Sequence, residues 1–64
     1  MIEDQEFQEL LRHLYKPAQR ALHKENIKSI DAMYALGKER LLDIHGIGPE
    51  TIKRTEAFTG RKFN

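Results

Sequence analysis

The sequence contains no cysteine and no tryptophan, and it has only two prolines and four glycines among its 64 residues. Without cysteine, the disulfides that stabilise many small secreted domains are excluded, so we expect a cytoplasmic protein. No apolar run approaches the ~20 residues that a helix needs to cross a bilayer. The acidic N-terminal segment is also unlike a signal peptide, so we expect a soluble protein with no membrane partner.

The chain is short, and it has few of the residue groupings that catalysis requires. We expect residues 1–64 to form one domain with a small core, because a domain of this size buries only about 60% of its unfolded surface. No Ser-His-Asp grouping and no carboxylate pair with a supporting site stands out, so we do not expect an enzyme. The three histidines, His13, His23 and His45, have no cysteine beside them and fit no metal-binding spacing. We therefore expect no catalytic residue, no metal and no cofactor.

A strong excess of one charge is also missing, because the formal net charge is only +1. The distribution is uneven: the first nine residues hold four acids and no base, and the other 55 hold 11 bases and six acids. A basic body behind an acidic leading segment can favour a polyanion, although such charges also occur on ordinary solvated faces. Charge alone does not decide between these two interpretations.

Apolar residues recur with the period of an α-helix and nowhere alternate as in a β-strand. Phe7, Leu10 and Leu14 lie on one stripe, which predicts an amphipathic helix over about residues 4–15 of a leading segment, 1–15. Lys16-Pro17 ends this helix, and Pro17 occupies the first turn of the next one. The pattern therefore predicts an all-α fold that begins with two helices separated at this proline.

The remaining helix ends are marked by residues typical of helix caps. Asn26 is expected to stop the second helix, and Ser29 is expected to cap the start of a third. Gly37 breaks the third helix, a fourth follows over residues 38–44, and a fifth over residues 49–59 ends at Gly60. These signals together predict a compact bundle of about five short helices.

The most informative segment is residues 38–59, where two helices flank Gly46-Ile47-Gly48-Pro49. Gly46 supplies a position with positive φ, Ile47 enters the core, and Gly48 lets a ligand approach the main chain because it has no Cβ. Pro49 then begins a helix whose free N–H groups, from Gly48, Glu50 and Thr51, point outward at the positive end of the helix dipole. Such an arrangement favours an anion such as phosphate.

This segment resembles the helix-hairpin-helix motif of DNA-binding proteins that grip backbone phosphate through hairpin amides. With residues 16–22, 26–30 and 41–49, the order and spacing are similar to the C-terminal domain of the bacterial RNA polymerase α subunit. The similarity is closer still to small stand-alone proteins that share its fold, and it covers about residues 14–59. It implies a helical bundle with one helix-hairpin-helix and a role connected with transcription.

The resemblance implies double-stranded DNA as the partner. The family uses the minor groove and the flanking phosphates, so we expect weak binding with little sequence preference. Gly46 belongs to the turn itself, and the other contacts are those that the family's positions imply. The predicted nucleic-acid-binding residues are Arg20, Gly46, Gly48, Thr51, Lys53 and Arg54.

Two positions differ from the family's pattern. Pro17 stands where the family has its principal minor-groove arginine, with Lys16 or Gln19 as neighbouring substitutes, and Glu50 replaces a lysine. The alternative is therefore a protein–protein interaction domain that has kept the fold and lost DNA binding. A transcription or DNA-processing protein is the protein partner that fits the resemblance, and the sequence does not define the oligomeric state.

Overall fold

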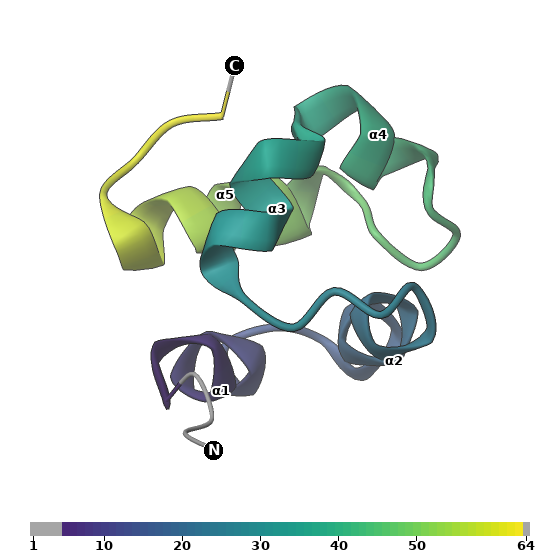
Figure 1. Cartoon of the computed structure of the whole chain (residues 1–64), viewed down its shortest axis with the longest axis horizontal. Helices are drawn as coiled ribbons and strands as arrows, with labels where there is room; N and C mark the ends of the chain where they lie inside the picture. The colour runs from purple at the N-terminus through teal and green to yellow at the C-terminus, as the bar shows by residue number, and fades with distance from the viewer. Residues whose placement is uncertain (1–4, 64) are drawn as a thin grey trace.

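The computed structural model describes residues 5–63, and within that range all the regular secondary structure is helical (Figure 1). The helices are α1 (Gln5–Arg12), α2 (Lys16–Lys24), α3 (Ile30–Leu36), α4 (Lys38–Asp43) and α5 (Pro49–Thr59). The predicted all-α fold with about five short helices is therefore confirmed for this part of the chain. None of the helices formed by residues 5–63 is long and apolar enough to span a membrane.

Several helices begin and end at the residues that the sequence indicated. Asn26, with φ of 62°, follows the end of α2. Ser29 caps α3, because its Oγ accepts the N–H of Ala32 at 3.0 Å. Gly60 ends α5 in the left-handed conformation, with its N–H donating to Glu56 O at 2.8 Å. These three predictions are confirmed.

The first helix is shorter than predicted. It ends at Arg12 rather than near residue 15, and its predicted start at residue 4 lies outside the described residues. The N–H groups of His13 and Leu14 donate to the carbonyls of Leu10 and Leu11 at 2.8 and 3.1 Å, which tightens the chain into a turn. Leu14 is only 5% exposed, so it reaches the core from this turn without the helix continuing.

Gly37 separates α3 from α4 and serves both helices. Its φ is 96°, its N–H donates to Met33 O at 3.1 Å, and its carbonyl accepts the N–H of Leu41 at 3.0 Å. The fourth helix ends at Asp43, one residue earlier than predicted, because Ile44 adopts an extended conformation. The direct α3–α4 connection therefore depends on the one residue type that adopts positive φ readily.

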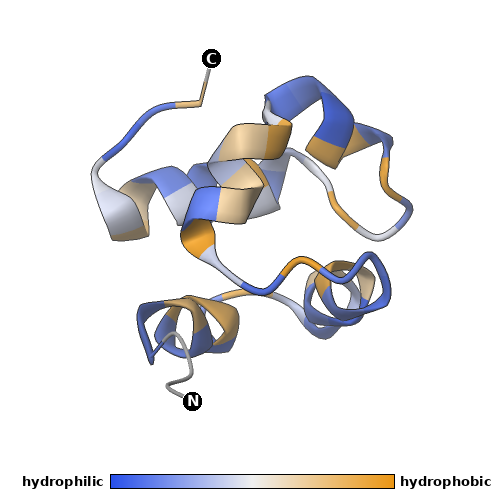
Figure 2. Ribbon diagram, in the orientation of Figure 1, coloured by the Kyte–Doolittle hydropathy of each residue, from blue (hydrophilic) through white to orange (hydrophobic). Residues whose placement is uncertain are grey.

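The core lies where the apolar stripes of the helices meet. Figure 2 shows α1 and α4 most clearly, each apolar on one side and hydrophilic on the other. The buried apolar residues are Phe7, Leu10, Leu14, Ala18, Ala21, Leu22, Ile27, Ile30, Met33, Leu41, Ile47, Ile52 and Phe63. One polar side chain, Thr55, is fully buried among them, and its hydroxyl donates to Thr51 O at 2.8 Å. This bond satisfies the hydroxyl, so burial of the threonine leaves no unpaired donor.

Residues 60–63 fold back along α3. The Phe63 ring stacks on Tyr34 with centroids 4.1 Å apart, and the Phe63 N–H donates to Glu56 Oε2 at 2.9 Å. The Tyr34 hydroxyl is 2.6 Å from Thr59 Oγ1 and donates to Arg61 O at 2.7 Å. The final turn of α5 and the segment after it are therefore held against α3.

Candidate nucleic-acid interface

The turn between α4 and α5, residues 44–48, lies against the beginning of α2. Gly46 has φ of 102°, as predicted, and Ile47 is buried with its N–H donating to Ile44 O at 3.1 Å. A Cβ on Gly46 would lie 2.9 Å from Pro17 O and 3.3 Å from Ala21 Cβ. Glycine is therefore required here both for its backbone conformation and for its close approach to α2.

Gly48 and Glu50 have free amides at the start of α5. The Gly48 backbone is extended, with φ of −124°, and a Cβ added there would meet nothing within 4 Å. Among the hydrogen bonds of residues 5–63, none uses the N–H of Gly48 or of Glu50. These two donors lie at the positive end of an 11-residue helix, where an anion is stabilised.

Thr51 was predicted to contribute a free amide to this surface, and that prediction of a free amide is wrong. Its side chain is on the buried side of α5, with the residue only 4% exposed. Its N–H donates to Gly48 O at 3.0 Å instead of remaining free. The start of α5 therefore offers two free amides rather than the three that were predicted.

Arg54 is also predicted as a DNA contact, but the fold already engages it. Its Nη1 donates to His13 O and its Nη2 donates to Tyr15 Oη, each at 3.1 Å. The guanidinium lies 4.8 Å from the Tyr15 ring centroid, and Nε is 3.3 Å from Glu50 Oε2 without hydrogen-bond geometry. Arg54 therefore joins α5 to the α1–α2 junction and is not a free cation beside the turn.

The Glu50 carboxylate is partly neutralised by the same contact. Glu50 and Arg54 are four residues apart on α5, and their side chains are 55% and 39% exposed. An ion pair this exposed contributes little to stability, roughly 0–1 kcal/mol. The pair matters more for the charge of this surface. It holds the carboxylate of Glu50, the one acid in the first turn of α5, beside the guanidinium of Arg54. The i,i+4 spacing of Glu50 and Arg54 was a sequence signal for the pair.

The free basic side chains near the turn come mainly from α2. Arg20, a predicted contact, is exposed and lies between Pro17 and Ala21, the two residues that meet Gly46. Lys16 and Lys24 are exposed four residues before and after Arg20, so the three form a row along one edge of the helix. We call Lys16, Arg20 and Lys24 the α2 basic row. Lys24 was not predicted, although its spacing from Arg20 was visible in the sequence.

Two further residues complete the description of this surface. Lys53, as predicted, is exposed on the first half of α5. Gln19, proposed as a substitute for the missing arginine, instead donates from Nε2 to Leu14 O at 2.9 Å and stabilises the α1–α2 connection. Of the predicted contacts, Arg20, Gly46, Gly48 and Lys53 therefore lie on or around the turn and are not held by other side chains.

The comparisons with known proteins found no match, so the geometry described above is the basis for a proposal on function. No family model matches the chain, and no curated protein and no solved structure matches it. Within residues 5–63, no group of three histidine, aspartate or glutamate side chains is placed to hold a metal ion.

Proposed function

We propose that this chain is a helix-hairpin-helix module that binds the phosphate backbone of double-stranded DNA. The observation that carries the proposal is the combination of two free amides, from Gly48 and Glu50, with open space around Gly48. Gly48 has no Cβ, and no atom lies within 4 Å of the position that a Cβ would take, which favours close approach of a phosphate oxygen to the main chain there. The function is binding rather than catalysis.

The α2 basic row and Lys53 supply the charge that such an interface needs. The contact of Gly46 with Pro17 and Ala21 brings α2 beside the turn, so the exposed cations of α2 belong to the helix that packs against it. Backbone contacts of this kind fix the position of a protein on DNA without reading its sequence. We therefore propose Gly48, the Glu50 amide, Lys16, Arg20 and Lys53 as the contacts, and we omit Thr51 and Arg54.

So few contacts imply weak binding. Non-specific affinity rises with the number of phosphates that lysine and arginine neutralise, and it is typically 10⁻⁴ to 10⁻⁶ M at physiological salt. We expect this module at the weak end of that range. The resemblance to the polymerase domain further supports a role in bacterial transcription, in which a second module or a partner protein raises the affinity.

A protein-interaction domain is the second candidate function. Tyr15 and Phe58 are exposed aromatic residues, at 58% and 36%, and neither belongs to the α4–α5 turn. Exposed aromatic side chains are enriched at protein interfaces. This candidate predicts no DNA contact at the turn, which separates it from the first.

An NMR titration of the full chain with a short DNA duplex at low salt tests the proposal. We expect amide shifts at Gly46, Gly48 and Glu50. We expect Gly48→Val to weaken binding about tenfold, because loss of one charge-assisted hydrogen bond costs about 1.5 kcal/mol or more. Valine suits the extended backbone at this position, so the fold should persist. Shifts confined to other surfaces, or equal affinity of the variant, would contradict DNA binding through the turn.

A further inference from the structure

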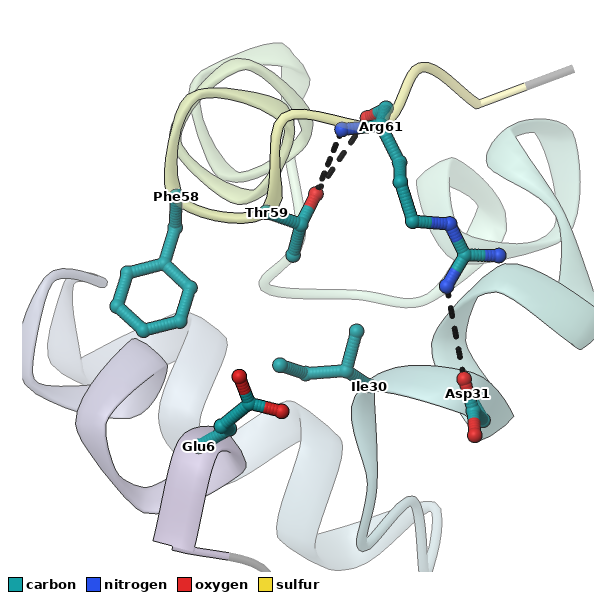
Figure 3. A pocket seen from close by; sticks show the side chains of 6 residues that line it. All are labelled: Glu6, Ile30, Asp31, Phe58, Thr59 and Arg61. Atoms are coloured by element: carbon teal, nitrogen blue, oxygen red, sulfur yellow. Dashed lines mark hydrogen bonds and ion pairs between the residues drawn. The ribbon is translucent and has the colours of Figure 1, made fainter.

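A small cavity lies at the other end of the molecule, between α1, the start of α3 and the end of α5. Its volume is about 230 Å³, and Figure 3 shows the residues that line it. They are Glu6, Ile30, Asp31, Phe58, Thr59 and Arg61. Figure 1 shows these elements on the side opposite the α4–α5 turn. The cavity is smaller than the pockets of roughly 300–1,000 Å³ that hold drug-sized ligands, and it suits a single long side chain.

Two aromatic rings each carry one of the chain's own arginines, and one of these arginines, Arg61, also lines the cavity. The Arg54 guanidinium lies 4.8 Å from the Tyr15 ring centroid and is paired with Glu50. The Arg61 guanidinium lies 4.2 Å from the Tyr34 ring centroid. Its Nη1 is 3.5 Å from Asp31 Oδ1. In both places an aromatic ring and a carboxylate hold a guanidinium between them.

The cavity contains a third combination of an aromatic ring and a carboxylate, Phe58 and Glu6. Figure 3 shows the Glu6 carboxylate turned toward Ile30, with the Phe58 ring to one side. Among residues 5–63, no guanidinium or ammonium lies over Phe58, and no base is within ion-pair distance of Glu6. The His13 ring contacts Phe58 at 5.5 Å between centroids and supports it from the turn after α1. The composition therefore matches the two arginine sites. Arg61 also lines the cavity, but it lies over the Tyr34 ring and pairs with Asp31, so among residues 5–63 no arginine pairs with Glu6 or lies over Phe58.

We propose that this cavity receives an arginine side chain from a partner protein. The guanidinium would pair with Glu6 and stack against Phe58, and its aliphatic stem would contact Ile30. Asp31 adds negative charge, because its side chain is 94% exposed and Arg61 pairs with one of its oxygens. The lining holds two carboxylates against one guanidinium, that of Arg61, so its formal charge is negative and disfavours phosphate. The proposal concerns a protein partner and is independent of the DNA proposal.

Arginine suits the cavity better than lysine for a geometric reason. The guanidinium is planar, so it can lie against a ring while it donates two parallel hydrogen bonds to a carboxylate. Lysine offers a compact and strongly hydrated charge that gains less from the ring. The site should therefore distinguish the two cations, whereas a merely acidic surface would not.

The test is an NMR titration of the full chain with Nα-acetyl-L-arginine methylamide. We expect saturable amide shifts at Glu6, Ile30, Asp31 and Thr59, with affinity on the order of 1 mM or weaker. The citrulline derivative, which has nearly the same shape but no charge, should bind at least about tenfold more weakly, the equivalent of 1.4 kcal/mol. The lysine derivative should bind about threefold more weakly than the arginine derivative, in keeping with its poorer fit to the ring and carboxylate.

Two variants make the result specific to the cavity. Glu6→Gln should weaken binding of the arginine derivative about fivefold or more, because it removes the charged partner. Glu25→Gln is the matched control, since Glu25 is an exposed acid at the end of α2 and does not line the cavity. Circular dichroism checks that both variants remain folded. Equal binding of arginine, lysine and citrulline derivatives, or equal losses in the two variants, would overturn the proposal.

The outcome does not depend on DNA. Glu6→Gln should leave the duplex-induced shifts at Gly48 unchanged, and Gly48→Val should leave arginine binding unchanged. Failure of the arginine titration with DNA binding intact would therefore reject the cavity proposal alone.

Discussion

Two glycines in one turn have different physical roles. Gly46 has positive φ and nearly touches α2, whereas Gly48 is extended with open space beside it. A side chain at Gly46 would be strained by the backbone and would collide with Pro17 O. A side chain at Gly48 would disturb nothing within the chain. Gly46 is therefore required for folding. The fold does not require glycine at position 48, so its role there is better explained by approach of a ligand.

This difference predicts effects of unequal size for the same substitution. Gly46→Ala should lower the free energy of unfolding by about 1–3 kcal/mol from the backbone conformation alone, and the contact with Pro17 should add to that loss. Gly48→Ala should cost less than about 1 kcal/mol, the modest penalty for alanine at a helix N-cap. Urea denaturation of both variants checks this. Similar losses at the two positions would show that Gly48 has a structural role that its open surroundings do not reveal.

At the scale of helices, one arginine determines how α5 meets the α1–α2 junction. The two hydrogen bonds from Arg54 span 39 and 41 residues of sequence. They depend on the fork of the guanidinium, because Nη1 and Nη2 reach different acceptors. A lysine with the same charge cannot reach both.

Substitution of Arg54 by lysine should therefore destabilise the fold almost as much as substitution by alanine. We expect both to lower the free energy of unfolding by about 1–2 kcal/mol, the combined value of two partly exposed hydrogen bonds. Glu50→Gln, which removes only the exposed ion pair, should cost less than about 1 kcal/mol. Urea denaturation measures all three. Full rescue by lysine would show that charge rather than geometry matters at this position.

Helix boundaries were predictable where the signal is local. Ser29, Asn26 and Gly60 act through their own backbone preferences or hydrogen bonds, so the sequence was sufficient to place them. The end of α1 was not predictable in this way, because Leu14 continues the helical spacing although the chain has already turned. The helical spacing of apolar residues indicates which side chains are buried. It does not show where the helix ends, because a turn can also bury a side chain.

The orientation of α5 explains why Thr51 is buried and Arg54 is engaged by the fold, although both were predicted as DNA contacts. Between Pro49 and Thr59 the large apolar residues are Ile52 and Phe58 alone, and Phe58 is partly exposed. With so few apolar residues the orientation of the helix depends on its neighbours. Thr51 and Thr55 were therefore not recognisable as buried, and the engagement of Arg54 depends on residues about 40 positions away. Gly46, Ile47 and Pro49 were predictable because the turn itself requires them.

At the scale of the whole molecule, the two proposals assign opposite charge preferences to two surfaces. The α2 basic row and the free amides of Gly48 and Glu50 favour an anion. The cavity at the far end of α5 is proposed to favour a cation, because its lining holds Glu6 and Asp31 against one base, Arg61. A net charge of +1 hides this separation. Under the two proposals, one face of the molecule contacts DNA while the opposite end contacts protein.

The anion-binding region predicts a specific response to salt. If Lys16, Arg20 and Lys53 neutralise about three phosphates, log K should fall with log[salt] with a slope of about −2 to −3. Lys53→Ala should make the slope shallower by about one unit, because it removes one phosphate contact. Lys62→Ala is the control, since Lys62 is an exposed cation beyond α5, in the C-terminal segment that Figure 1 shows away from the turn. Fluorescence anisotropy with a labelled duplex at several salt concentrations measures all three slopes. An equal change for both lysines would indicate diffuse attraction to a weakly basic surface, and undetectable binding at the lowest salt would favour the protein-interaction domain.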